Sequence, residues 1–333
     1  MENCTTQSIY KTSLRQFSNK TLVIDTSIYL YKFAEKGAVA ENMYLLISVF
    51  RQHNIVPVFV FDGKPPPEKK ALLIKRKMEK DAAEERYNVL KTELESGSAS
   101  ETAGKELEQL KRQFVRVTDA DISKSKEVMR AYGVPYIESR GESDHLCAFL
   151  VKHGFAWACV SDDMDMFLYS CPRVIRHLSL LNHEGVFYDT AGILKELDMS
   201  QDVFNDIAIL SGTDYNINEQ NTLSDTVRLY MDYRKWAYSN RSEYGNTPFC
   251  DWLIHNTEYV KNADQFLRIR KMFHLSNYLA ERRDEFKEIV DIMPFELKAY
   301  RLEDLSVALK SEGFLFPQGN RRFPSKPSLP NPR

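Results

Sequence analysis

Residues 21–62 read TLVIDTSIYLYKFAEKGAVAENMYLLISVFRQHNIVPVFVFD and contain two short apolar runs, at positions 21–25 and 55–62. Both runs are rich in β-branched side chains and almost unbroken, which is typical of strands that are buried on both faces. Residues 41–53, between them, carry apolar side chains at helical spacing. A strand, a helix and a second strand in this order predict a βαβ unit and therefore a parallel sheet.

The alternation of strand and helix continues along the chain. Further strands are expected at residues 134–137, 155–163 and 173–179, and helices at residues 123–132 and 142–153. We therefore predict an α/β fold in which helices flank a mostly parallel central sheet.

Two charged segments interrupt this core. Residues 68–94 and 105–114 are rich in good helix formers but have only a thin apolar stripe, and SGSASETAG at 96–104 joins them as an expected flexible tip. They predict a helical hairpin that projects from the sheet near Asp62. The expected domains are an α/β core at 1–215 with this hairpin inserted as an arch at 64–116, a helical region at 216–315 with helices at 222–238 and 264–283, and a disordered Pro-rich tail at 316–333.

Composition excludes several classes of protein. The chain has 333 residues, is 43% hydrophobic and 28% charged, and has a net charge of -2, but residues 64–80 hold seven Lys or Arg against two Glu. Its five cysteines show no CxxC spacing, which argues against a zinc site or a disulfide scaffold and favours a reducing compartment. With no signal peptide and no membrane-spanning run, we expect an intracellular protein, nuclear or cytoplasmic, that is not secreted and has no membrane partner.

Acidic residues recur where apolar runs end or where the next helix opens. They are Asp25, Asp62, Glu142, Asp144, Asp163, Asp165 and Asp214. In a parallel sheet the carboxyl ends of the strands meet at one edge, where ligands bind. Carboxylates gathered there repel one another unless cations neutralise them, and Mg²⁺ or Mn²⁺ suits such ligands. The pattern predicts a two-metal hydrolase that acts on phosphodiesters.

The spacing of the acids carries further expectations. Asp163 and Asp165 would point to the same side of an extended strand end. Glu142 and Asp144 would diverge by about 200° within a helix, so they converge only if Glu142 stands at the helix entrance. Simple capping of that helix is an equal alternative for this pair. A structural turn is the simpler interpretation of Asp25 or Asp214 taken alone, whereas the combination of all the acids is specific.

The segments IDTSIYLY, VFVFDGKPP, GVPYIESRGESDHLCAFLVKHG, VSDDMDMF and LSGTDY, in this order, resemble the flap endonuclease (XPG) family of structure-specific 5′ nucleases in the PIN-like superfamily. The resemblance covers about residues 21–215. It implies a PIN-like fold with a helical arch, two Mg²⁺ ions that Mn²⁺ can replace, and hydrolysis of branched or flapped DNA in replication, repair or recombination.

Carried over by position, the resemblance implies that all seven acids bind metal. It implies that Lys69 and Arg76 grip the scissile phosphate as catalytic residues and that Tyr31 stacks on a nucleotide. We also expect Lys64, Lys70 and Lys75 to bind substrate. The alternatives are that Lys69 is one exposed lysine among many and that Tyr31 packs in the core.

Several positions depart from the family pattern. Asp144 replaces a longer Glu, the N-terminal glycine motif is missing, and DYNINEQNTLSDTVRLY lacks the glycines that hold a potassium ion and the downstream duplex. The tail has no sliding-clamp motif, and we expect a monomer. These departures favour a divergent member, for which a large DNA virus is one source. A PIN-like RNA nuclease and a catalytically inactive scaffold of the same fold are the alternative functions.

Overall fold

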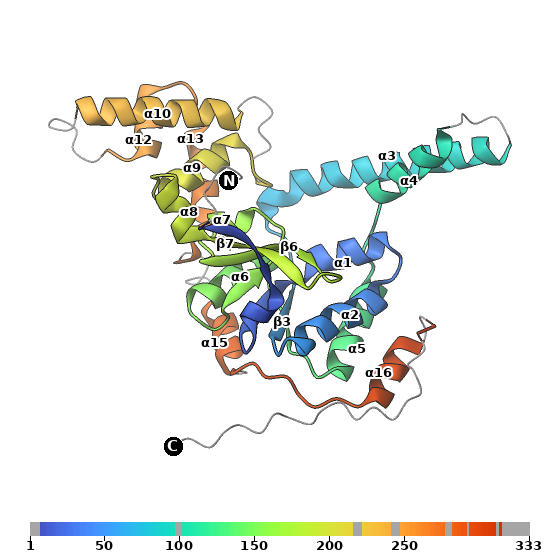
Figure 1. Cartoon of the computed structure of the whole chain (residues 1–333). Helices are drawn as coiled ribbons and strands as arrows, with labels where there is room; N and C mark the ends of the chain where they lie inside the picture. Colours follow the sequence, from blue (N-terminus) through green and yellow to red (C-terminus); the bar gives the residue numbers. More distant parts are fainter. Residues whose placement is uncertain are drawn as a thin grey trace, which may run out of the picture.

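The computed structural model describes residues 7–96, 102–215, 222–240, 247–276, 282–291, 293–310 and 313–314. Within these residues, a sheet with the strand order β1-β7-β6-β5-β2-β3-β4 lies at the centre of the molecule (Figure 1). Neighbouring strands from β6 to β4 run parallel, which confirms the predicted mostly parallel sheet. The strands are β1 (Ile9–Ser13), β2 (Thr21–Asp25), β3 (Val56–Phe61), β4 (Tyr136–Glu138), β5 (Ala158–Val160), β6 (Arg173–Ser179) and β7 (Glu184–Asp189).

Two antiparallel strands at one side of the sheet were not predicted. Strand β7 pairs antiparallel with β6, and β1 pairs antiparallel with β7. Both strands are partly exposed; Tyr10 and Lys11 of β1 face solvent. An antiparallel edge strand with a solvated face needs no unbroken apolar run, so it lacks the signal that identifies the central strands.

Helices cover both faces of the sheet, and β2 shows how its residues divide between them. Leu22 and Ile24 belong to the core on one face, whereas Val23 belongs to the core on the other. The first face is covered by α1 (Thr26–Glu35), α2 (Val39–Gln52), α5 (Asp119–Ala131) and α16 (Leu302–Leu309). The second is covered by α6 (Ser143–Lys152), α7 (Asp165–Leu168) and α9 (Gln201–Ser211). Short helices η1 (Leu14–Phe17) and α8 (Thr190–Glu196) complete the core.

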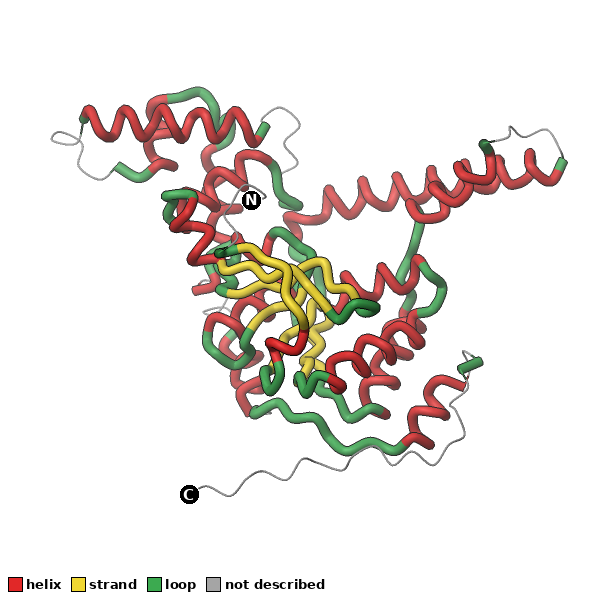
Figure 2. Tube along the Cα trace, in the orientation of Figure 1, coloured by secondary structure: helices red, strands yellow, loops and turns green. Residues whose placement is uncertain are grey.

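The predicted arch is present as a pair of helices that project from the sheet (Figure 2). It begins with η2 (Pro67–Lys69), followed by α3 (Lys70–Glu95) and α4 (Ala103–Gln113). Ala83 is the single buried side chain of the 26 residues of α3, so this helix owes little to core packing. Ala103 was expected in the flexible tip; instead it begins α4 and is buried. Gly104 of that tip is also helical, and positions 97–101 lie outside the described residues.

The region after the core is helical, as predicted, with α10 (Leu223–Ser239), α12 (Phe249–Asn256), α13 (Ala263–Met272) and α15 (Arg283–Asp291). The single helix expected at 264–283 is wrong. Helix α13 ends at Met272, because Phe273 turns into the core against the rings of Tyr169 and Tyr215. The expected disordered tail at 316–333 and the glycine-poor segment at 216–221 lie outside the described residues. None of the described helices has the length and apolar character of a membrane span.

Candidate active site

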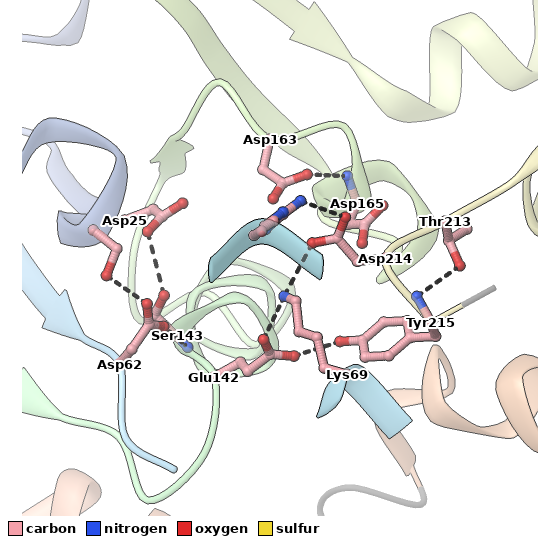
Figure 3. Close-up of polar contacts among 12 residues, drawn as sticks. Asp25, Asp62, Lys69, Glu142, Ser143, Asp163, Asp165, Thr213, Asp214 and Tyr215 are labelled. Atoms are coloured by element: carbon pink, nitrogen blue, oxygen red, sulfur yellow. Dashed lines mark hydrogen bonds and ion pairs between the residues drawn. The ribbon is translucent and has the colours of Figure 1, made fainter. Parts of the chain in front are cut away.

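The acids gather at the carboxyl edge of the parallel strands, where Figure 3 shows Asp25, Asp62, Glu142, Asp163, Asp165 and Asp214. Asp144 belongs to the same cluster, because burial and then the charges of Asp25, Asp163, Asp62 and Glu142 raise its pKa. Asp25 is the last residue of β2, and Asp62 directly follows β3. The next pair opens α6, whereas Asp163 follows β5 and Asp165 is the first residue of α7. Asp214 differs from the expected pattern, because it follows the helix α9 rather than a strand. The predicted cluster therefore exists, although one member reaches it from a helical segment.

The entrance of α6 decides between the two interpretations of Glu142. This residue is the N-cap, with extended backbone (φ -68°, ψ 144°), and its side chain makes no capping hydrogen bond. Its carboxylate instead accepts hydrogen bonds from Lys69 Nζ (2.5 Å) and the Tyr215 hydroxyl (2.5 Å). Glu142 therefore joins the site, as its position at the helix entrance predicted. Gly63 brings the loop after β3 close to this entrance, since a Cβ there would lie 2.0 Å from the Ser139 carbonyl oxygen.

The expected extended geometry of Asp163 and Asp165 is wrong. Strand β5 ends at Val160, and Asp165 is already the first residue of α7. Asp163 Oδ1 accepts a hydrogen bond from the Asp165 backbone N–H at 2.8 Å, which turns the chain into that short helix. The two carboxyl groups still interact, because the charge of Asp163 contributes to the raised pKa of Asp165.

Serine side chains hold the acids on the β2 side, and sequence reasoning missed them. Ser161 and Ser143 donate to Asp25 at 2.8 and 3.3 Å, and the Ser143 backbone N–H donates to Asp62 at 2.7 Å. Ser27 donates to the second oxygen of Asp62. Each serine lies within two residues of a predicted acid in the sequence or opens the following helix, which was an available signal.

Burial and mutual repulsion mark the cluster as short of positive charge. Burial, followed by the charges of Asp62 and Asp163, raises the pKa of Asp25 to about 7. Burial and neighbouring carboxylates also raise the pKa of Asp144 well above its usual range and that of Asp165 to about 7. Within the described ranges, no three His, Cys, Asp or Glu side chains close around a common point as a metal site. The donor chemistry nevertheless fits divalent cations, which prefer carboxylate oxygens and would offset this repulsion.

Two arch residues enter the cluster. Lys69 Nζ lies 2.5 Å from Glu142 Oε1 and 3.2 Å from Asp214 Oδ2, and Arg76 lies 2.9 Å from Asp214 Oδ1. Burial opposes the charge of Lys69, but its contacts with the two acids outweigh burial and raise its pKa. Lys69 is therefore not an ordinary exposed lysine. Both cations lie on the side of the arch that faces the acids, as their spacing predicted.

The other predicted substrate residues divide into three groups. Tyr31 is 47% exposed in the middle of α1, and the Lys80 ammonium of the arch lies 4.7 Å from its ring centroid, so core packing does not explain Tyr31. Lys64 and Lys70 line a cavity beneath the arch base. Lys75 is exposed on α3, outside both the acid cluster and the described lining of that cavity.

Tyr215 is a site residue that sequence reasoning quoted within LSGTDY but did not assign. Its hydroxyl donates to Glu142 and lies 2.9 Å from the hydroxyl of buried Tyr169. Its ring also lies 5.6 Å from Lys69 Nζ. Tyr215, the residue after Asp214, therefore contacts both Glu142, through its hydroxyl, and Lys69, through its ring.

Known proteins match this chain in both halves of the core. The family description "XPG N-terminal domain" matches residues 3–83, and "XPG I-region" matches residues 133–214. The chain belongs to the flap endonuclease (XPG) family. It is therefore a structure-specific DNA nuclease, an enzyme that hydrolyses phosphodiester bonds. Mg²⁺ dependence is general in this XPG family.

Relatives in the XPG family match to different extents. Flap endonuclease 1 of Methanococcus aeolicus is 26% identical over 332 residues, which cover 94% of this chain and 89% of that protein. Flap endonuclease 1 of Glycine max is 32% identical, but the match covers 63% of this chain and only 58% of that protein. The catalytic core of Rad2 in complex with a DNA substrate has the same fold, with a TM-score of 0.62 at 21% identity over 92% of this chain and 91% of that one.

Proposed function

We propose that this XPG-family nuclease is a Mg²⁺-dependent endonuclease and 5′ exonuclease that cuts flapped or branched DNA during replication, repair or recombination. One observation carries the proposal. A buried cluster of carboxyl groups, with pKa values raised first by burial and then by their mutual repulsion, lies directly against two cations at the base of a projecting arch. A hydrolase of phosphodiesters needs both features, namely carboxylates for metal ions and cations for the phosphate.

The acids are the proposed ligands of two Mg²⁺ ions, which Mn²⁺ can replace. They are Asp25, Asp62, Glu142, Asp144, Asp163, Asp165 and Asp214. When bound, a pair of such ions activates water and stabilises the leaving oxygen of an in-line displacement. The protein contributes the orientation of the ligands. Serine hydroxyls hold Asp25 and Asp62, and the Tyr215 hydroxyl holds Glu142, so hydrogen bonds fix the orientation of each of these carboxylates.

Lys69 and Arg76 are the proposed contacts of the scissile phosphate. Both reach the acid cluster from the arch, and donors aimed at the charge that develops on a phosphoryl group stabilise the transition state. Tyr31 stands exposed across the arch base and is the proposed stacking surface for a nucleobase. Lys64, Lys70 and Lys75 are proposed to hold the DNA backbone.

The proposed domain division follows these roles. Residues 1–215 form the nuclease core, with the arch at 64–116 inserted between β3 and α5. The helical part at 216–315 supports the DNA, and 316–333 is proposed as a tail. A monomer suffices, because all the proposed site residues come from one chain. DNA with a 5′ single-stranded flap is the proposed substrate, since a projecting arch beside the site suits a single strand.

A panel of labelled DNAs tests the proposal. Flapped, nicked, bubble and four-way-junction DNAs, together with an RNA of matching sequence, are incubated with Mg²⁺, with Mn²⁺ or with EDTA, and the products are sized on a gel. We expect cleavage of flapped DNA in Mg²⁺ and Mn²⁺ and none in EDTA. Undiminished cleavage in EDTA would refute the metal mechanism, and cleavage of RNA alone would favour the PIN-like RNA nuclease. If the wild-type protein cuts none of these substrates, the inactive scaffold is favoured. The presence of all the proposed metal ligands argues against that outcome.

A further inference from the structure

Strand β6 continues beyond the end of its parallel neighbour β5. The last backbone contact between them is the hydrogen bond from the Ser161 N–H to the Ile175 carbonyl oxygen, at 3.2 Å. Beyond this point the register of β6 against β7 shifts between Arg176 and Ser179, and His177 has a positive φ of 53°. Bulges of this kind re-aim side chains and are frequent beside active sites. This bulge lies against the loop that leads from β5 to α7.

The bulge holds that loop through one side chain and one backbone group. Arg176 Nη2 donates to the Asp162 carbonyl oxygen at 2.7 Å, and the His177 backbone N–H donates to the Asp162 carboxylate at 2.6 Å. The other terminal nitrogen of the guanidinium, Nη1, contacts the sulfur of Met164. The guanidinium of Arg176 therefore contacts the residues on both sides of Asp163.

These contacts bear on the direction of two acids of the cluster. The Asp163 backbone N–H donates to Ser161 Oγ at 3.0 Å, and its carboxylate accepts from the Asp165 backbone N–H (Figure 3). Because Arg176 ties the residues before and after Asp163 to β6, the backbone at Asp163 is fixed and its side chain leaves toward the cluster. Asp165 begins α7 directly after this loop, so its position depends on the same contacts.

Packing alone does not account for an arginine at this position. The guanidinium carbon of Arg176 lies 5.6 Å from the centroid of the Tyr188 ring, a contact that an apolar side chain of similar length would also make. Its Nε is buried and has no hydrogen-bond partner among the residues that the structure describes, which costs stability. What an apolar side chain would lack is the hydrogen bond to the loop.

We propose that Arg176 is a positioning residue for metal binding, because it holds the loop 162–164 so that Asp163 and Asp165 are oriented as ligands. The inference rests on the proposed function, under which these acids bind Mg²⁺, and it adds a residue outside the acid and arch motifs. Partners that orient the ligands of a metal typically change its affinity by about 10- to 100-fold. Arg176 should therefore determine the affinity for Mg²⁺ and not the affinity for DNA.

A pair of arginines on one strand provides the test and its control. Arg176→Met keeps the contact with Tyr188 and removes the donors. The control is Arg173→Met at the opposite end of β6, where Arg173 Nε donates to the Trp157 carbonyl at 2.5 Å and the guanidinium lies 5.0 Å from the Trp157 ring.

The melting temperature of each protein is followed without DNA as Mg²⁺ is titrated, which gives the Mg²⁺ concentration for half of the stabilisation. Arg176→Met should raise this concentration about 10-fold or more, whereas Arg173→Met should leave it unchanged. Both variants should melt at a lower temperature in EDTA, since each loses a hydrogen bond to a backbone carbonyl.

Further measurements separate positioning from folding and from DNA contact. Arg176→Lys keeps the charge and one donor, so its Mg²⁺ requirement should lie between those of the wild-type protein and Arg176→Met. The affinity for flapped DNA in EDTA, measured by fluorescence anisotropy, should be the same for all these proteins, and high Mg²⁺ should restore cleavage by Arg176→Met.

An unchanged Mg²⁺ requirement in Arg176→Met would overturn the inference, and if that variant does not fold, an unchanged requirement in Arg176→Lys would do so. A loss of DNA affinity in EDTA would also overturn it, because Arg176 would then bind the DNA directly. Failure of the wild-type protein to be stabilised by Mg²⁺ and to cut flapped DNA would instead refute the proposed function.

Discussion

Removing one charge from the acid cluster should stabilise the protein. Burial and the charges of Asp163 and Asp214 raise the pKa of Asp165 from 3.8 to about 7. At pH 8, this shift corresponds to a cost of about 4 kcal/mol for keeping Asp165 ionised in the folded state. Asp165→Asn removes the charge at nearly constant volume. We therefore expect the variant, without metal, to unfold at a temperature higher by roughly 5 °C or more, at about 2 °C per kcal/mol for a chain of this size.

The stability difference between Asp165→Asn and the wild-type protein should depend on pH, which provides a second test of the reasoning. A carboxyl group whose folded-state pKa is raised contributes stability that is present below pH 3.8 and lost as the pH rises through about 7. At pH 5 the folded wild-type protein keeps Asp165 protonated, so the advantage of the variant should shrink to about 2 kcal/mol. The difference between the two melting temperatures should therefore grow steadily from pH 5 to pH 8.

Divalent cations should reverse the order of the two melting temperatures, so that the wild-type protein unfolds at the higher temperature. Ligands that bind only the folded state stabilise it, so Mg²⁺ should raise the melting temperature of the wild-type protein more than that of Asp165→Asn. The assay is a thermal melt followed by circular dichroism, in EDTA and in Mg²⁺, at several pH values. The same variant should lose DNA cleavage in Mg²⁺.

A neighbouring aspartate provides the matched control. Burial alone would raise the pKa of Asp162, but the His177 backbone N–H and the Lys32 ammonium outweigh it and lower the pKa. Asp162→Asn should accordingly lower the melting temperature at pH 8. If Asp165→Asn is as destabilising as Asp162→Asn in EDTA, the acids are not a repulsive cluster and the reasoning fails.

The remaining predictions concern the arch and the residues that support the acids. Lys69→Ala or Arg76→Ala should slow single-turnover cleavage by about 100-fold or more with little loss of affinity, whereas Lys91→Ala near the far end of α3 should change neither; weak binding with a normal rate at saturation would contradict this role. Tyr31→Ala should weaken DNA binding by about 10-fold while Tyr31→Phe should not, as measured by anisotropy, because stacking needs the ring alone. Tyr215→Phe should raise the Mg²⁺ concentration needed for half of the thermal stabilisation by about 10-fold, since it removes a hydrogen bond to a proposed ligand; an unchanged Mg²⁺ dependence would limit Tyr215 to packing.

The central sheet and the acid cluster were predictable from the sequence for one physical reason. Strands buried on both faces require unbroken apolar runs, so residues 21–25 and 55–62 could be assigned without any partner. The rule that parallel strands end at one edge then placed Asp25 and Asp62 together. The role of Glu142 at the entrance of α6 was one of two equal alternatives. Helix geometry allows Glu142 and Asp144 to converge only there, but simple capping explained the pair equally well until the structure showed that Glu142 makes no capping hydrogen bond.

Other features depend on contacts between distant segments and left little local signal. The edge strand β1 needs β7, which lies more than 170 positions away in the sequence, to satisfy its backbone. Helix α13 stops at Met272 because Phe273 finds a buried place against Tyr169, not because of a proline or glycine. The cavity beneath the arch likewise draws its basic residues from separate segments, so no single motif could indicate it.

Ion pairs at the base of the arch couple the arch to the acid cluster. One ammonium group, that of Lys69, bridges Glu142 at the start of α6 and Asp214 after α9. The same Glu142 is held by Tyr215, so three regions of the chain meet at a single buried charge. A cation that offsets these acids would weaken their attraction for Lys69 and Arg76, because the same carboxylate charge attracts both. The two arch residues would then be free to meet a phosphate, so the charge balance of the acids also determines where the arch can act.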